Sequence, residues 1–271
     1  MFYNHQFDWK KKLPQPICED MPDYDELYHK AWEMAHDHIR HIDGMPATPY
    51  MDEAFCDTQI WIWDTCFMTL FCKYAREVFP GIETLRNFYE TLYGDKKMPF
   101  VIPPDNEPAW TGAVPHEPYR IRVHLADNPP LFAWAEYSYA LMTGDREHLK
   151  QLLLEKKYLQ RHFEFLENLT AAGYVSPYTH APTCWVKHEH GYFWEGGRSG
   201  MDNTPRGRAG KTCSVNRPNN PDMLWLDAIC QQALAASSIA RLAAKLGDCE
   251  LEKFWQKKFD EHAAIIRKYY W

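Results

Sequence analysis

Two kinds of helical segment alternate along this chain, and the alternation restricts the folds that it can adopt. Segments of the first kind repeat apolar residues at three- and four-residue spacing, which predicts helices with one solvated side. They are residues 23–43, 81–93, 145–170 and 248–270. Segments of the second kind, residues 61–78, 130–143 and 222–246, are apolar on nearly every side. Such a helix is expected to be enclosed by other helices.

The links between these segments also fall into two classes. Each link from an apolar segment to an amphipathic one is short and contains a glycine, namely Gly81, Gly144 or Gly247. These glycines predict a left-handed helix stop followed by a tight reversal. The links in the other direction are long, at about 44–60, 94–129 and 171–221. Up-and-down alternation places the long links at one end of the bundle, where functional sites are usually built.

Inner helices alternating with outer helices describe an all-α fold, the (α/α) toroid. Three inner helices are visible in the sequence, whereas a closed six-hairpin ring needs six. We therefore expect either an open half-ring or the N-terminal part of an (α/α)6 barrel. The aromatic residues at the end of the chain, Tyr269, Tyr270 and Trp271, favour truncation at the C-terminus. The sequence shows no strong strand alternation.

Charge and composition limit the partners. The formal net charge is −7, which argues against nucleic acid because phosphate binding needs a basic face. Aromatic residues make up 15% of the chain, enough to fill a large core or to line a groove that stacks sugars. The start of the chain lacks a basic segment followed by an apolar run, and no stretch is long enough to cross a bilayer. We expect a cytoplasmic protein with no membrane partner and no cofactor.

The loop at residues 195–208 is the most unusual segment. It contains four glycines and three arginines around a single Asp-Asn pair, Asp202 and Asn203. An ordinary turn needs one or two such residues. The loop therefore suits either chemistry on a polar substrate or an elaborate turn.

Two further clusters fall on links at the same expected end of the bundle. Trp61, Trp63 and Asp64 open an inner segment, where the first N–H groups and the helix dipole favour a carboxylate. The run Asp127-Asn128-Pro129-Pro130 opens the next one, with proline expected at the first helical positions. Asp64 either caps its helix or accepts the hydroxyls of a sugar held between indoles. Asn128 likewise either caps a helix or binds a hydroxyl group.

Histidine-rich stretches raise the question of a metal site. They are His-Glu-His at 188–190 and the group His36, His38 and His41. Neither stretch supplies a convincing full ligand set. We therefore expect no metal.

Three motifs resemble successive signatures of glycoside hydrolase family 63 and of the related trehalase and mannosylglycerate hydrolase families. They are Trp61-Ile62-Trp63-Asp64-x-x-Phe67-Met68, Asn128-Pro129-Pro130 followed by Ala133-Trp134-Ala135, and Ser199-Gly200-Met201-Asp202-Asn203-Thr204-Pro205-Arg206. The third motif is specific, whereas the tryptophan motif alone is weak. The resemblance implies an (α/α)6 toroid that hydrolyses α-linked gluco- or manno-configured sugars with inversion. Residues 1–22 would be an N-terminal extension and residues 23–271 a partial glycosidase-like catalytic domain.

The resemblance also implies roles for individual residues. Asp202 matches the general acid of these enzymes, and the Trp-x-Trp-Asp segment matches the part that shapes the sugar pocket. A protonated Asp202 requires a poorly solvated pocket, whose wall the indoles of Trp61, Trp63 and Trp194 would supply. The expected substrate-binding residues are Trp61, Trp63, Asp64, Asn128, Trp194, Asn203 and Arg206.

The sequence departs from the family pattern at two motif positions. The usual Glu of Glu-Ser-Gly-x-Asp is Arg198 here, and the usual Gln before the two prolines is Asn128. The general base of the family lies in the later half of the toroid, and no residue of this chain matches it. We therefore expect hydrolysis to need the missing C-terminal half of the same polypeptide. We also expect Arg198 and Arg206 not to pair directly with Asp202.

Two other functions are compatible with the same features. One is a non-catalytic carbohydrate-binding or assembly domain. The other is a sugar epimerase or lyase on a similar barrel, which would use His or Tyr bases in place of two opposed carboxylates. His124, His188 and His190 are the candidates for that chemistry.

Overall fold

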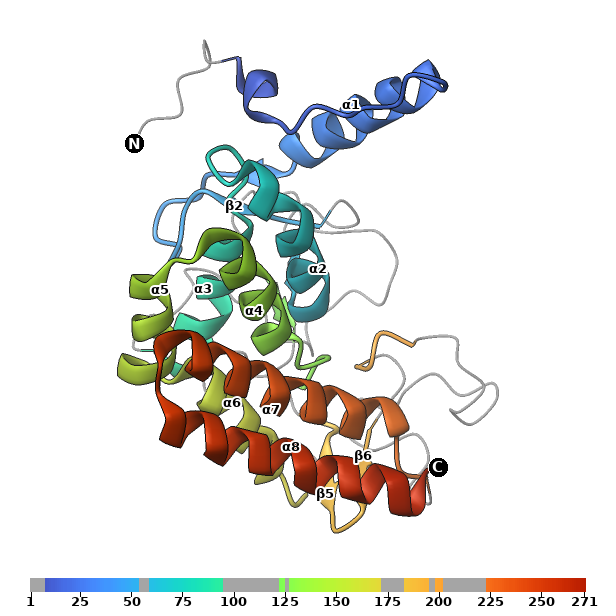
Figure 1. Ribbon diagram of the computed structural model, residues 1–271, viewed down its shortest axis with the longest axis vertical. Helices are drawn as coiled ribbons and strands as arrows, with labels where there is room; N and C mark the ends of the chain where they lie inside the picture. Colours follow the sequence, from blue (N-terminus) through green and yellow to red (C-terminus); the bar gives the residue numbers. More distant parts are fainter. Residues whose placement is uncertain are drawn as a thin grey trace.

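The computed structural model describes residues 8–53, 59–94, 122–124, 127–171, 183–194, 198–201 and 223–271. Most of these residues are helical, which confirms the predicted all-α class (Figure 1). The α-helices are α1 (Pro22–His36), α2 (Ile62–Cys72), α3 (Gly81–Tyr93), α4 (Phe132–Thr143), α5 (Arg146–Lys150), α6 (Tyr158–Glu167), α7 (Leu226–Leu246) and α8 (Cys249–Tyr269). Shorter helical turns are η1 (Trp9–Lys12), η2 (Lys73–Ala75) and the π-helical turn η4 (Gln151–Glu155).

In the described part of the chain, three pairs of short strands accompany the helices. Strand β1 (Ile39–Arg40) pairs antiparallel with β2 (Tyr50–Met51), and β5 (Val186–His188) pairs antiparallel with β6 (Gly191–Phe193). Strand β3 (Gln59–Trp61) pairs in parallel with β4 (Arg122–His124). The sequence did not predict these strands, because two or three residues are too few to show a period of two.

Several predicted helix boundaries need correction. The segment predicted at 23–43 is helical only to His36, and the segment predicted from 222 begins at Leu226. The single helix predicted at 145–170 is divided into α5, η4 and α6, with Lys157 at a left-handed φ of 54° before α6. The two prolines before α4 lie outside the helix, because its N-cap is Leu131.

The short glycine links are confirmed at two of the three predicted positions. Gly144 and Gly247 have φ values of 62° and 80° and end α4 and α7 in the left-handed conformation. Gly81 is instead the first residue of α3. A Cβ at Gly81 would lie 2.5 Å from the Cβ of Cys72, so glycine is required there for the close approach of α3 to α2.

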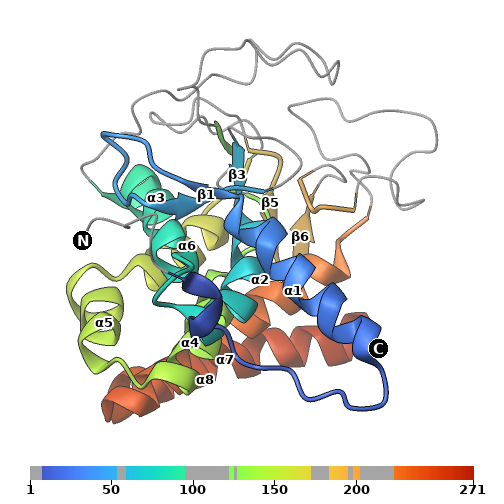
Figure 2. The same cartoon turned by 90° about the horizontal axis from the view of Figure 1, so that it is seen from above.

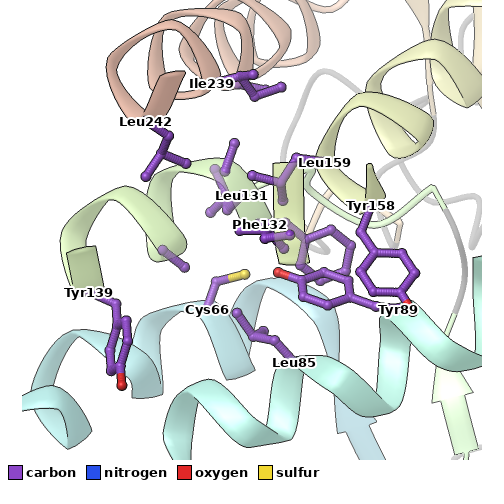
Figure 3. Packing of buried hydrophobic residues seen from close by; sticks show 14 of the residues in the cluster. Cys66, Leu85, Tyr89, Leu131, Phe132, Tyr139, Tyr158, Leu159, Ile239 and Leu242 are labelled. Carbon is purple, nitrogen blue, oxygen red and sulfur yellow. The ribbon is translucent and has the colours of Figure 1, made fainter. Parts of the chain in front are cut away.

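The helices form two layers around a shared core. Helices α2, α4 and α7 are neighbours in that order, α3 packs on α2, and α8 runs along α7 (Figures 1 and 2). Figure 3 shows the core between them, where Tyr89 of α3 lies between Phe132 of α4 and Tyr158 of α6. The ring centroids of Tyr89 are 5.0 Å from Phe132 and 5.1 Å from Tyr158. Such aromatic contacts fix the relative positions of the helices.

The apolar helices α2, α4 and α7 are not enclosed on every side by the described residues. Large apolar side chains on these three helices are between 37% and 58% exposed; they are Phe67, Phe71, Leu141, Met142, Leu226 and Leu234. The expectation of full enclosure is therefore wrong for the described part of the chain. Each of these helices has buried side chains in the core, while the large apolar side chains named above stay partly exposed. Among the described residues, no helix combines the length and the apolar character needed to cross a bilayer.

Candidate functional site

A parallel strand pair brings the starts of two inner helices together. Strand β3 leads directly into α2 at Trp61, and β4 ends three residues before Asp127 in the turn that precedes α4. In the register of the pair, Trp61 lies opposite His124. Because parallel strands end at the same edge, the start of α2 and the turn before α4 lie at one end of the bundle. This arrangement agrees with the predicted convergence of the long links.

The third long link joins the same end through Asp127 and Asn128. The side-chain amide of Asn128 donates from Nδ2 to the backbone oxygen of Arg198 at 3.0 Å. The indole of Trp194 donates from Nε1 to the backbone oxygen of Asp127 at 2.9 Å. Both Asp127 and Asn128 are buried. The turn before α4 therefore holds the segment that leads into the Ser199-Gly200-Met201 motif.

Asp127 also uses its carboxylate to hold this segment. Its Oδ2 accepts hydrogen bonds from the backbone N–H of Cys184 at 2.6 Å and of Trp185 at 3.2 Å. Its Oδ1 lies 3.3 Å from Nη1 of Arg198. The carboxylate is fully buried, and the two amides and the guanidinium compensate for its lost hydration. Asp127 is absent from the predicted site residues, although an acid directly before Asn-Pro-Pro was a signal for it.

The tryptophan motif and the glycine motif meet at Trp63 and Gly200. Gly200 has a left-handed φ of 71°, and a Cβ at this position would lie 2.1 Å from Cζ2 of the Trp63 indole. Only glycine allows both this conformation and this approach. The motifs that the sequence separates widely are therefore in contact.

A partly exposed row of aromatic rings continues from Trp63 along α2 and onto α4. The ring centroid of Phe67 is 5.6 Å from that of Trp63 and 5.9 Å from that of Trp134. Phe67 is 43% exposed, and both tryptophans are partly exposed. Aromatic faces of this kind stack on the C–H face of a sugar ring. The row gives the candidate site an apolar wall next to the Trp63–Gly200 contact.

Glu53 caps the start of α2 and was missed from the sequence. Its Oε1 accepts hydrogen bonds from the backbone N–H of Trp61 and from Oγ1 of Thr65, both at 2.9 Å. Burial raises the pKa of Glu53 well above its usual value, and the nearby Asp64 carboxylate adds to this effect. Asp64 itself lies in the first turn of α2. No local pattern reveals the role of Glu53, because it precedes the helix by several residues.

Of the remaining predicted site residues, only Trp194 lies in the described part of the chain. Trp194 is fully buried, with its ring centroid 4.9 Å from that of Trp185 and 6.2 Å from that of Trp225. It therefore supports the site through Asp127 from within the core. Asp202, Asn203 and Arg206 lie outside the described residues.

Two of the three candidate histidines of the epimerase alternative, His188 and His190, lie on the β5–β6 hairpin, whereas His124 is the last residue of β4. The ring of His190 stacks on Tyr269 of α8 at 3.8 Å, and Nδ1 of His188 accepts a hydrogen bond from the backbone N–H of His190 at 3.2 Å. The stacking on Tyr269 attaches the hairpin to the end of α8. Within the described parts of the chain, no three His, Cys, Asp or Glu side chains are grouped so that they could hold a metal ion.

Comparisons of the chain with models of protein families, with curated proteins and with solved structures find no match.

Proposed function

We propose that this chain carries the sugar-binding wall and the general acid of an inverting glycoside hydrolase that acts on an α-linked gluco- or manno-configured sugar. Asp202 is the general acid in this proposal. Helices α2, α4 and α7 are inner helices, and α3, α6 and α8 are outer helices, of an (α/α) toroid.

The joining of the three motif-bearing segments is the observation that carries this proposal. The glycine motif reaches the tryptophan motif through Gly200 and Trp63, and it reaches the Asn-Pro-Pro motif through Arg198 and Asn128. Met201, which directly precedes Asp202 in the chain, is 42% exposed. In this proposal the acid that follows this junction in the sequence serves a sugar bound on the aromatic row.

The proposed chemistry needs two carboxyl groups with opposite roles. A protonated Asp202 donates its proton to the leaving glycosidic oxygen, while a second carboxylate about 6.5–9.5 Å away activates the attacking water. In this proposal the second carboxylate belongs to further helices that complete the toroid. The exposed apolar side chains of α2, α4 and α7, such as Phe71, Leu141 and Leu234, support packing of such helices there. The chain alone should therefore bind sugar without hydrolysing it.

Sugar binding tests the aromatic wall directly. α-Glucosides, α-mannosides and glycosylglycerates are titrated into the chain while tryptophan fluorescence and binding heat are measured. Phe67→Ala should weaken binding by about tenfold, because loss of one stacking ring costs about 1–1.5 kcal/mol. Phe254→Ala is the matched control, since Phe254 is 51% exposed on α8. Equal affinities of Phe67→Ala and the unchanged chain would contradict the assignment of the wall.

Hydrolysis tests the role of Asp202. The polypeptide extended beyond Trp271 is assayed on the same sugars, and the anomeric configuration of the product is followed by NMR. Asp202→Asn should lower kcat by about 10²–10⁴-fold, as expected for loss of a general acid. Retention of configuration would exclude the inverting mechanism. Turnover that survives Asp202→Asn but is abolished by His188→Gln would favour the epimerase or lyase alternative.

A further inference from the structure

Asp127 connects separate parts of the chain at the candidate site. Its carboxylate accepts from the amides of Cys184 and Trp185, just before β5, at 2.6 and 3.2 Å. Its backbone oxygen accepts from the indole of Trp194, just after β6, at 2.9 Å. Asp127 therefore holds both ends of the β5–β6 hairpin.

Arg198 is held at two points by the same turn. Its guanidinium lies 3.3 Å from Oδ1 of Asp127, and its backbone oxygen accepts from Nδ2 of Asn128 at 3.0 Å. Because both the guanidinium and the backbone oxygen of Arg198 are held, the position of this residue relative to the turn before α4 is fixed. Gly200, two residues later, lies against Trp63 in a left-handed conformation. The conformation of the 198–201 segment therefore depends on where Arg198 is held.

The charges of this pair are matched in the buried interior. The side chain of Asp127 is fully buried and that of Arg198 is 7% exposed. Arg198 stands where the family that this chain resembles usually has glutamate. A buried arginine requires a nearby anion. Asp127 supplies that anion from the turn before α4.

We propose that Asp127 is a positioning residue that fixes Arg198 and, through it, the backbone of residues 198–201. Its effect on catalysis rests on the proposed function, because the segment leads to Asp202. Asp127 does not contact the sugar in this proposal. It sets where the segment that carries the general acid leaves the junction with Trp63.

Hydrogen exchange followed by mass spectrometry tests the positioning without any turnover. Asp127→Asn keeps an oxygen for the amides but removes the charge that Arg198 faces. Peptides that cover residues 198–201 should exchange about tenfold faster, whereas peptides from α7 should change little. Glu136→Gln is the matched control, because Glu136 is an equally buried carboxylate that contacts Tyr89 and His148. It should not open residues 198–201 selectively.

A double substitution separates positioning from a general structural role. In Asp127→Asn with Arg198→Met, no buried guanidinium is left without its anion, so exchange at 198–201 should fall back by about threefold from the single Asp127→Asn variant. Independent, additive effects of the two substitutions would overturn the proposal. If Asp127→Asn does not fold, Arg198→Met alone should speed exchange at 198–201 selectively, and an equal rise throughout α7 would overturn it.

Kinetics of the extended polypeptide give the catalytic readout. Asp127→Asn should lower kcat by about 10²-fold with KM changed by less than about threefold, because a misplaced acid slows the reaction without altering sugar contacts. A raised KM with unchanged kcat would overturn the positioning role. If the unchanged polypeptide hydrolyses none of the sugars, the proposed function fails, while the exchange experiment still decides whether Asp127 positions the segment.

Discussion

Gly200 lies against the indole of Trp63 so closely that a Cβ at residue 200 would be only 2.1 Å from Cζ2 of that ring. This contact connects the start of α2 with the loop that leads to Asp202. Gly200 also has a left-handed φ of 71°, which is a second reason why glycine is needed at this residue. The residue is therefore constrained by backbone conformation and by packing together.

A comparison of Gly200→Ala with Gly247→Ala should separate the cost of the left-handed conformation from the cost of the contact with Trp63. Gly247 is also left-handed, with a φ of 80°, but a Cβ there meets nothing within 4 Å. Gly247→Ala should cost about 1–2 kcal/mol for the left-handed conformation alone. Gly200→Ala should cost about 1–3 kcal/mol more, because Trp63 must move. Urea unfolding measures both values, and equal losses would show that the Trp63 contact contributes nothing to stability.

A buried carboxylate on α4 raises the pKa of a histidine on α5. The Glu136 carboxylate, with smaller contributions from Asp145 and Glu83, raises the pKa of His148 to about 9 against the opposing effect of burial. Oε2 of Glu136 lies 2.6 Å from Nε2 of His148, and Tyr89 donates to Oε1 at 2.9 Å. The charged imidazolium therefore stabilises the packing of α5 on α4.

The stability of the chain should fall between about pH 6.5 and pH 9 because of His148. Its folded pKa is raised, so its contribution is complete below the unfolded pKa near 6.5 and is lost as pH rises through about 9. The expected loss is at most about 3 kcal/mol. The measurement is urea unfolding at several pH values for the unchanged chain and for His148→Gln. A difference between the two chains that stays constant across this window would exclude the ion pair as its cause.

The β5–β6 hairpin is attached to the helices through Glu167 of α6. Although burial opposes its ionisation, hydrogen bonds from His262 and Tyr192 and the charge of Lys187 lower the pKa of Glu167 to about 2. Nζ of Lys187 lies 3.0 Å from Oε2 of Glu167, and Tyr192 donates a short hydrogen bond to Oε1. The ionised carboxylate thus joins α6 to both strands of the hairpin.

Glu167→Gln should lower stability at neutral pH by up to about 3 kcal/mol. A lowered folded pKa gives stability that is complete above the unfolded value of 4.5 and is lost as pH falls through about 2. The difference between the unchanged chain and Glu167→Gln should therefore shrink between pH 4.5 and pH 3. Glu164→Gln, on the exposed side of α6, is the control and should change stability little. If the differences in stability among the three chains stay constant over this pH range, the role of Glu167 is contradicted.

The helices were predictable because their signals are local. The segment 81–93 was predicted with the bounds that α3 has in the structure, and the left-handed stops at Gly144 and Gly247 followed from single residues. Alternation of helix types also predicted that the long links lie at one end of the bundle, and the described ends of these links do meet there. The division of the segment 145–170 at Lys157 was not predictable, because its apolar spacing continues across the break.

The supports of the site could not be predicted, since they depend on contacts between distant parts of the chain. Nothing in the sequence near Glu53 shows that it accepts from the amide of Trp61. The run that contains Asp127 was predicted only to open a helix, whereas the structure places the Asp127 carboxylate against Cys184, Trp185 and Arg198. The motif residues could be identified from the sequence pattern, but the residues that hold them in place could be identified only from the structure.

Two side chains of α7 test which of its sides belongs to the core. Ile239 is fully buried, whereas Leu234 is 38% exposed. Ile239→Ala should cost about 2–5 kcal/mol, because it leaves a cavity among packed side chains. Leu234→Ala should cost less than about 1 kcal/mol, because much of its surface already meets water. Urea unfolding at low and high protein concentration measures both. A loss at Leu234 as large as that at Ile239, independent of concentration, would mean that this side of α7 is packed within the monomer, and the exposed face proposed to receive further helices would not exist.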